Sequence, residues 1–387
     1  MSQTASREKF NAVEQRLMVA FELGWSKWRL ALGAAMGQKP WQITIPARNA
    51  VALCEAIVKA KKRLGLPADC PIVTCYEAGR EGFWLHRLLE QMGIQNLVVD
   101  SSSIEVNRRA RRAKTDRLDA GKLLSMLLRY VAGEKRLWSV VHVPTREQED
   151  GRHLQREIRT LKKERTRQIN RIRGLLANQG VAIRANRRGL LEPLDSIRIW
   201  DGSPLPAALK RRVEIEVARH DFVHRQLLDL ESERDARIRK SQERAAEIAR
   251  RLMTLRGIAE VGAETYAREF SWRGFTNRRQ VGSLMGVTPT PHQSGELSKE
   301  RGISRAGNRH MRGIAIDLAW LWLRQQPDSQ LSLWFNRRFA SGGPRLKKIG
   351  IVALARKLLI ALWRYADYGE IPKGALLKPG FSQINAA

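Results

Sequence analysis

Two aspartates three residues apart, Asp116 and Asp119, open a stretch whose apolar residues recur with helical spacing. Residues i and i+3 share one face of a helix, and two carboxylates on one face repel each other unless a cation lies between them. Oxygen ligands of this kind suit Mg²⁺ or Mn²⁺. The alternative is a solvated helix face whose acids form ion pairs within the chain. The basic residues around the pair, which would attract a polyanion and bring its phosphates to the metal, are Arg108, Arg109, Arg111, Arg112, Lys114, Arg117 and Lys122.

The composition of the chain also indicates a polyanionic partner. Its 387 residues include 70 Lys and Arg against 39 Asp and Glu, a formal net charge of +31. An excess of this size, spread along the chain, is typical of proteins that bind nucleic acid. Three cysteines without a Cys-x-x-Cys pair argue against a zinc site or a disulfide framework and favour the cytoplasm. No run approaches the ~18 apolar residues of a membrane span, so we expect no membrane partner.

Two further acids lie at or near the ends of predicted strands in the first third of the chain. Glu22 lies near the end of the first predicted strand and Glu77 at the end of the fourth. Strand ends are where α/β sheets place their sites. Four converging carboxylates would hold two divalent ions about 3.5–4 Å apart, an arrangement suited to in-line displacement at phosphorus. Asp100 and Glu105 are rival ligands.

Strands and helices alternate after an initial meander, which predicts a mixed sheet covered by helices. The predicted strands are 17–23, 28–32, 42–45, 71–77 and 94–99, and the predicted helices are 49–64, 81–92 and one that carries the two aspartates.

The composition changes after Pro144. Two long, highly charged helices are predicted at 146–177 and 207–252, and together they could form an antiparallel coiled-coil hairpin. Arg165 and Gln168 interrupt its apolar seam. Such a hairpin serves as a spacer or an oligomerisation arm, or its arginines contact phosphate; the two interpretations carry equal weight.

The last third of the chain is predicted to be mainly helical. Gly257 and Gly262 bracket a turn between two helices that looks like a helix-hairpin-helix, which would point backbone N–H groups at a phosphate. A plain turn between helices explains the same pattern. Further helices are predicted at 275–286, 309–325, 328–338 and 351–368.

A stretch rich in Pro, Gly and Ser, from Gly286 to Arg312, has no apolar periodicity and predicts a long unstructured loop. Ser294 lies in it. A serine among guanidinium groups beside a phosphate could attack phosphorus, with the arginines stabilising the developing charge. A serine that caps a turn is the alternative. The arginines that follow it are Arg301, Arg305, Arg309 and Arg312.

Several motifs occur together and in a characteristic order. They are Glu22 in a strand, Tyr76-Glu77-Ala78-Gly79, Lys114-Thr115-Asp116 with Asp119-Ala120, Gln293-Ser294-Gly295, and Ser304-Arg305-Ala306-Gly307-Asn308 with Arg312. Over nearly the whole chain they resemble the DEDD transposases of the insertion sequence 110 family, which are related to the Piv-type DNA invertases.

The resemblance implies a fold of three parts. These are an α/β RuvC-like (RNase H-like) domain over 1–145, a coiled-coil helical insertion over 146–250, and a mainly α C-terminal transposase domain over 251–387.

The resemblance also implies a chemistry. Glu22, Glu77, Asp116 and Asp119 would be the Mg²⁺ (or Mn²⁺) ligands, and Ser294 would attack the DNA backbone to form a covalent phosphoserine link. The implied partners are donor and target DNA, a structured bridge RNA, and further copies of the chain in dimers and tetramers. The nucleic-acid contacts expected from the motifs are Arg111, Arg112, Lys114, Arg305, Asn308 and Arg312.

One residue departs from the family pattern, because the first acid is more often Asp and is here Glu22. Glutamate is one methylene longer and needs a shifted backbone to reach the same ion. Two other functions remain open from the sequence: a Mg²⁺-dependent RuvC-like nuclease that needs the acids but not the serine, and a non-catalytic nucleic-acid-binding protein that needs neither. The expected location is the bacterial cytoplasm, in association with the nucleoid.

Overall fold

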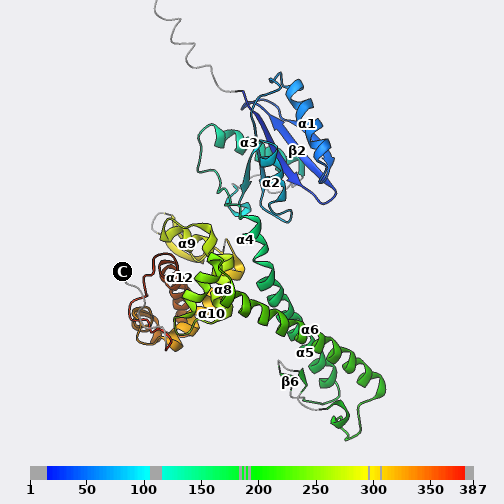
Figure 1. The fold of residues 1–387 in the computed structure, drawn as a ribbon, viewed down its shortest axis with the longest axis vertical. Helices are drawn as coiled ribbons and strands as arrows, with labels where there is room; N and C mark the ends of the chain where they lie inside the picture. The colour runs from blue at the N-terminus through cyan, green and yellow to red at the C-terminus, as the bar shows by residue number, and fades with distance from the viewer. Residues whose placement is uncertain are drawn as a thin grey trace, which may run out of the picture. The chain divides into compact units, whose positions relative to one another are not determined.

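The computed structural model divides into two compact units, residues 1–143 and 144–387 (Figure 1). The structure describes residues 15–104, 116–182, 185–186, 189–190, 193–294, 297–305 and 307–379. Among these, no helix is long and apolar enough to cross a membrane. The separation of the helical hairpin from the C-terminal helices as a third domain stays a prediction.

Unit 1 is built on one mixed sheet with the strand order β3-β2-β1-β4-β5. The strands are β1 (Leu17–Leu23), β2 (Lys27–Gly33), β3 (Trp41–Pro46), β4 (Ile72–Glu77) and β5 (Gln95–Val99). The first three form an antiparallel meander, and β4 and β5 run parallel to β1. The predicted mixed sheet is confirmed, and its order is consistent with an RNase H-like fold.

Helices cover both faces of this sheet (Figure 1). They are α1 (Ala50–Arg63), α2 (Trp84–Gln91) and α3 (Asp116–Val131), with a short 3₁₀ turn at Ser101–Ser103. Side chains alternate along β1: Val19 and Phe21 pack with α1 and α2, whereas Met18 and Ala20 pack with α3. Asn49 caps the N-terminus of α1, since its side chain accepts from the Ala52 amide at 2.9 Å.

Unit 2 begins with a helical hairpin of α5 (His153–Ala177) and α6 (Ala207–Lys240), preceded by α4 (Arg146–Asp150). The end of α5 packs on the start of α6, and the start of α5 packs farther along α6, so the two are antiparallel. Polar residues occupy the middle of the seam. Arg165 is buried there, and the buried Glu216 accepts from Arg171 and Arg219 at 2.9 and 2.7 Å. Two-residue strands, β6 (Ala185–Asn186) and β7 (Gly189–Leu190), and a 3₁₀ turn (Leu194–Ser196) lie between the helices.

Both long helices of the sequence prediction are interrupted. The first breaks at Gly151, and the second ends at Lys240 before α7 (Arg244–Met253) begins. Arg268 contacts both breaks: its guanidinium pairs with Glu243, and a Cβ on Gly151 would lie 2.9 Å from its Nη1 atom. The hairpin is therefore joined to the C-terminal helices around one buried arginine.

The C-terminal helices share one apolar core. They are α7, α8 (Glu260–Glu269), α9 (Arg278–Leu284), α10 (Arg309–Gln325), α11 (Gln330–Phe335), a π-helical turn (Asn336–Ala340) and α12 (Pro344–Tyr368), with a 3₁₀ turn at Ser271–Arg273. The segment from Gly286 to Arg312 was predicted to be an unstructured loop, and this is wrong. It contains an antiparallel hairpin of β8 (Pro289–Ser294) and β9 (Leu297–Ile303).

The glycines of the helix-hairpin-helix-like segment serve packing. Gly257 has a φ of +86° in the turn, and a Cβ on it would meet the Gln325 side chain at 2.9 Å. Gly262 lies inside α8, where a Cβ would meet Leu318 at 2.7 Å. The carbonyl of Arg256 in the turn accepts from the Gln326 side chain. These contacts favour a plain turn between packed helices.

Candidate active site and nucleic-acid interface

Glu22 and Glu77 lie at the same level of the sheet. Strands β1 and β4 are parallel neighbours, and Phe21 pairs with Tyr76. Each glutamate directly follows one member of that pair. Because the register is shared, the two residues belong to one rung of the sheet, and their backbones are separated by about 4.7–4.9 Å, the spacing of neighbouring strands.

The same two acids share a face of the sheet with α3. Glu22 continues the alternation of Met18 and Ala20, and Glu77 continues that of Val73 and Cys75; these four apolar residues pack with α3. The Cys75 thiol lies 3.9 Å from the carbonyl of Leu123 in α3, and burial raises its pKa far above the usual value. Asp119, half-buried, precedes the buried Ala120 that joins this core.

The loops that follow β1 and β4 contact each other. Trp25, in the turn after β1, is 67% exposed, and the guanidinium of Arg80 from the loop after β4 lies 4.9 Å from its ring centroid. Arg48 lies 4.6 Å from the same ring and forms an ion pair of 2.5 Å with Glu81. An exposed indole with two guanidinium groups is typical of a nucleic-acid contact. Our sequence interpretation missed it because the three segments are far apart in the chain.

The complete set of four acids is not observed. Asp116 is the first residue of α3, but its side chain is outside the described part of the structure. Among the described residues, no group of three or more His, Cys, Asp or Glu side chains is arranged to hold a metal ion. The rival Asp100 accepts from the amide and hydroxyl of Ser102, both at 2.9 Å, as the cap of a 3₁₀ turn. The predicted residues that lie outside the described ranges are Glu105, Arg108, Arg109, Arg111, Arg112 and Lys114.

Ser294 is the last residue of β8 and pairs with Leu297 of β9. It therefore lies at the tip of the hairpin, about 17 Å along the strand from Pro289 at a rise of ~3.4 Å per residue. Its side chain, and residues 295–296, are outside the described part of the structure. Its role as nucleophile stays a prediction.

The other predicted contacts of this region have structural tasks. The Asn308 side chain caps α10 by accepting from the amides of His310 and Met311 at 3.0 and 3.2 Å. Arg312 donates to the carbonyl oxygens of Met285 at 2.7 Å and Arg305 at 3.3 Å. These bonds hold the two ends of the β8–β9 segment together. Their contact with nucleic acid stays a prediction.

Arg305 is different, because it lines a large groove beside the base of this hairpin. The groove has a volume of about 1080 Å³. We call it the basic groove, since seven of its lining residues are cations and none is an acid: Arg278, Arg279, Arg305, Arg345, Lys348, Arg356 and Lys357.

The floor of the basic groove is apolar. Val287, Ile303 and Trp334 lie among the cations, and the Lys357 ammonium is 4.7 Å from the Trp334 ring centroid. Cations interleaved with an aromatic ring bind a phosphate backbone and its bases. The sequence prediction began the last helix at Ile351 and so missed Arg345 and Lys348, which lie on its first two turns.

A mixed sheet with two carboxylates on one rung, together with a basic helical unit, defines the class as an enzyme acting on nucleic acid. Comparison with known proteins is more specific. Residues 249–332 match the model described as "Transposase IS116/IS110/IS902 family", and residues 32–179 match a DEDD transposase model of the same group. The second match includes Glu77, Asp116 and Asp119 and begins after Glu22.

Relatives match most of the chain. The Sinorhizobium fredii protein named "Putative transposase y4rJ" is 41% identical over 377 residues, 94% of each chain. The Coxiella burnetii "Transposase for insertion sequence element IS1111A" is 27% identical over 291 residues, 74% of each chain. The chain belongs to the IS116/IS110/IS902 family of transposases, which are enzymes that act on DNA. The resemblance stated from the motifs is thereby confirmed.

Proposed function

We propose that the chain cuts and rejoins DNA through Ser294, with a divalent metal held by acids of unit 1 and with a structured bridge RNA as guide. The observation that carries the proposal is the placement of Glu22 and Glu77 on one rung and one face of the sheet, the face that α3 covers. An enzyme that cuts and rejoins chromosomal DNA would be located at the nucleoid in the bacterial cytoplasm.

The carboxylate set fits a hard divalent cation. Glu22, Glu77, Asp116 and Asp119 would hold Mg²⁺ or Mn²⁺, which prefer oxygen ligands. The metal would stabilise charge that develops on the phosphate oxygens. The basic charge of unit 2, including the basic groove and Arg305, would hold donor DNA, target DNA and the RNA.

The serine supplies the covalent step. The Ser294 hydroxyl loses its proton as its oxygen bonds to phosphorus, and the bond from phosphorus to one deoxyribose oxygen breaks. The leaving oxygen takes a proton and becomes a free strand end. Attack by another strand end on the phosphoserine restores Ser294 and rejoins DNA. A dimer or tetramer would bring acids and serine together, each placed by its own unit.

A denaturing gel tests this proposal. The full-length protein is incubated with Mg²⁺, labelled donor and target DNA, and the RNA flanking its element. We expect a protease-sensitive protein–DNA band that disappears in Ser294→Ala and in the absence of RNA. Ser283→Ala, an exposed serine on α9, is the matched control and keeps the band. Nicked DNA without a covalent band would instead favour a RuvC-like nuclease that uses water.

A further inference from the structure

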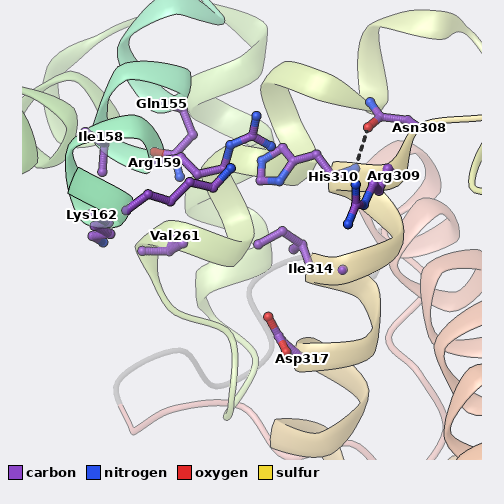
Figure 2. Close-up of a pocket in the computed structure, with 12 residues that line it drawn as sticks. Gln155, Ile158, Arg159, Lys162, Val261, Asn308, Arg309, His310, Ile314 and Asp317 are labelled. Carbon is purple, nitrogen blue, oxygen red and sulfur yellow. Dashed lines mark hydrogen bonds between the residues drawn. The ribbon is translucent and has the colours of Figure 1, made fainter. Parts of the chain in front are cut away.

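A second cavity lies between the helical hairpin and α10, apart from the basic groove. Its volume is about 700 Å³. Figure 2 shows side chains from α5, α8 and α10 extending into it. The lining residues that carry charge are Arg159, Lys162, Lys163, Arg309 and Asp317.

The charges of this cavity favour an anion. Lys162 is paired with Glu231 of α6 at 2.6 Å. No ion pair forms between any described residue and Arg159, Lys163 or Arg309. The N-terminus of α10, with its positive end of the helix dipole, opens at the same place. Three cations without an acidic partner therefore line the cavity, against one exposed acid, Asp317.

Two buried nitrogen atoms point to a ligand. Arg159 Nε and His310 Nε2 are inaccessible to solvent and have no hydrogen-bond partner among the described residues. Buried polar atoms in proteins are nearly always hydrogen-bonded, so each exception needs an explanation. Figure 2 shows the two side chains extending into the space between α5 and α10 from opposite sides. A small rotation of the Arg159 side chain would expose this N–H group to an anion in the cavity.

The apolar lining indicates what the anion belongs to. Ile158, Val261 and Ile314 line the same cavity. They suit the flat face of a base, which is available only when the base is unstacked. The volume is within the roughly 300–1,000 Å³ of pockets that enclose small organic groups. The exposed Asp317 carboxylate is a hydrogen-bond acceptor for an exocyclic amino group.

We propose that this cavity binds one unpaired nucleotide of a DNA or RNA strand. Arg159, Lys163 and Arg309 hold its phosphate, and the base lies against the apolar residues with Asp317 at its edge. The inference rests on the proposed function in one respect, since the strand would belong to the DNA substrate or to the RNA partner. It adds a site at which the enzyme distinguishes single-stranded from paired nucleic acid.

Binding is measured by fluorescence anisotropy on the full-length protein in EDTA, with a labelled single-stranded DNA, the same sequence as RNA, and the duplex. The double variant Arg159→Gln/Lys163→Gln should weaken single-strand binding about tenfold or more and reduce the salt slope by about 0.7, the value for one phosphate contact on a single strand. Arg225→Gln, an exposed arginine on α6 outside the cavity, is the control and should change the affinity less than twofold.

A second variant leaves the charge intact. Gly313 lines the cavity, and a Cβ on it would have no atom within 4 Å, so Gly313→Trp fills the cavity without clashing at its base. We expect the same loss of single-strand binding with duplex binding unchanged. If only DNA binding or only RNA binding falls in these variants, the nucleic acid affected is the one that occupies the cavity.

Equal loss on duplex and single strand, or wild-type binding by both variants with unchanged thermal unfolding, overturns the proposal. Because these assays contain no metal and form no covalent product, their failure is separate from failure of the Ser294 reaction.

Discussion

Arg156 of α5 and Glu269 of α8 form a two-bond ion pair that joins the helical hairpin to the C-terminal helices. The Nε–Oε1 distance is 2.7 Å and the Nη2–Oε2 distance is 3.0 Å. The two partners differ in exposure, since the Arg156 side chain is 46% exposed and that of Glu269 only 4%. Loss of one partner therefore has unequal consequences.

Arg156→Gln should destabilise the protein more than Glu269→Gln. The first substitution leaves a buried carboxylate without its cation, at a cost of about 3 kcal/mol. The second leaves an arginine that can turn into water, at a cost of about 1 kcal/mol. Urea unfolding of both variants and of the double variant measures this, and the double variant should recover part of the larger loss. Equal costs would show that burial of the glutamate does not control the stability.

Gly307 should be intolerant of substitution. Its φ is +98°, and a Cβ on it would lie 2.2 Å from the carbonyl oxygen of Leu284. The adjacent Asn308 caps α10, so a shift at Gly307 also disturbs this cap. Gly307→Ala should cost at least about 2 kcal/mol in the free energy of unfolding, the strain of a left-handed residue plus the clash.

Gly174 provides the matched control for this substitution. It lies inside α5, and a Cβ on it would have no atom within 4 Å. Gly174→Ala should stabilise the protein by about 0.5–1 kcal/mol. Urea unfolding of the two variants should give changes of opposite sign. A neutral result for Gly307→Ala would mean that the backbone at this position relaxes without cost.

The sheet and most helices could be predicted from the sequence because each carries a local signal. The apolar run at 17–23 and the helical spacing at 309–325 correspond to β1 and α10. Glu22 and Glu77 could also be predicted as site residues, because they lie at the ends of predicted strands. Their shared position in the sheet could not be derived from the sequence. Strand β1 pairs with β4, which follows β2 and β3 in the chain, and no local sequence signal sets the register of that pairing.

The β8–β9 hairpin was missed for a physical reason. Pro289 and Pro291 lack the N–H group of a ladder and usually exclude a strand. In a two-stranded sheet every strand is an edge strand, and the register shift between these two prolines accommodates them. The first turns of α12 were missed because they lie outside the core: Leu346 is 41% exposed and Ile349 is 52% exposed. Helical periodicity is visible only where one face is buried.

The basic groove should carry a measurable part of the affinity for duplex DNA. Arg345→Gln/Lys348→Gln removes two exposed cations from the start of α12. If each contacts one phosphate, the slope of log K against log salt should fall by about 1.8. Filter binding at several salt concentrations measures this. The exposed Arg225 again supplies a control by Arg225→Gln, and an identical slope in the double variant and wild type would rule out the groove as a duplex site.

His310 should make the stability of unit 2 depend on pH. Burial lowers its pKa; the nearby cations Arg159, Arg156 and Lys163 lower it further, and Glu269 opposes them. Well above pH 6.5 the histidine is neutral in both the folded and the unfolded state. As the pH falls below 6.5, the unfolded state takes up the proton first. Stability is therefore lost progressively from about pH 6.5 down to the lowered pKa of the folded state.

His310→Gln should therefore lose less stability than wild type between pH 7.5 and pH 5. Urea unfolding at both pH values measures the difference, and the other histidines cancel because both proteins contain them. A larger loss in the variant than in wild type would contradict the direction of the pKa shift.

The shared rung of Glu22 and Glu77 gives a prediction about metal binding. Glu22→Gln and Glu77→Gln should each weaken Mn²⁺ binding and reduce strand cleavage by about 100-fold or more, because an amide cannot supply the charge of a carboxylate ligand. Glu55, which is 61% exposed and lies on α1 across the sheet, provides the control Glu55→Gln. Mn²⁺ titration calorimetry together with the cleavage assay separates ligand loss from misfolding. Unchanged Mn²⁺ affinity in both glutamate variants would mean that other residues bind the metal and that Glu22 and Glu77 have no role beyond their positions at strand ends.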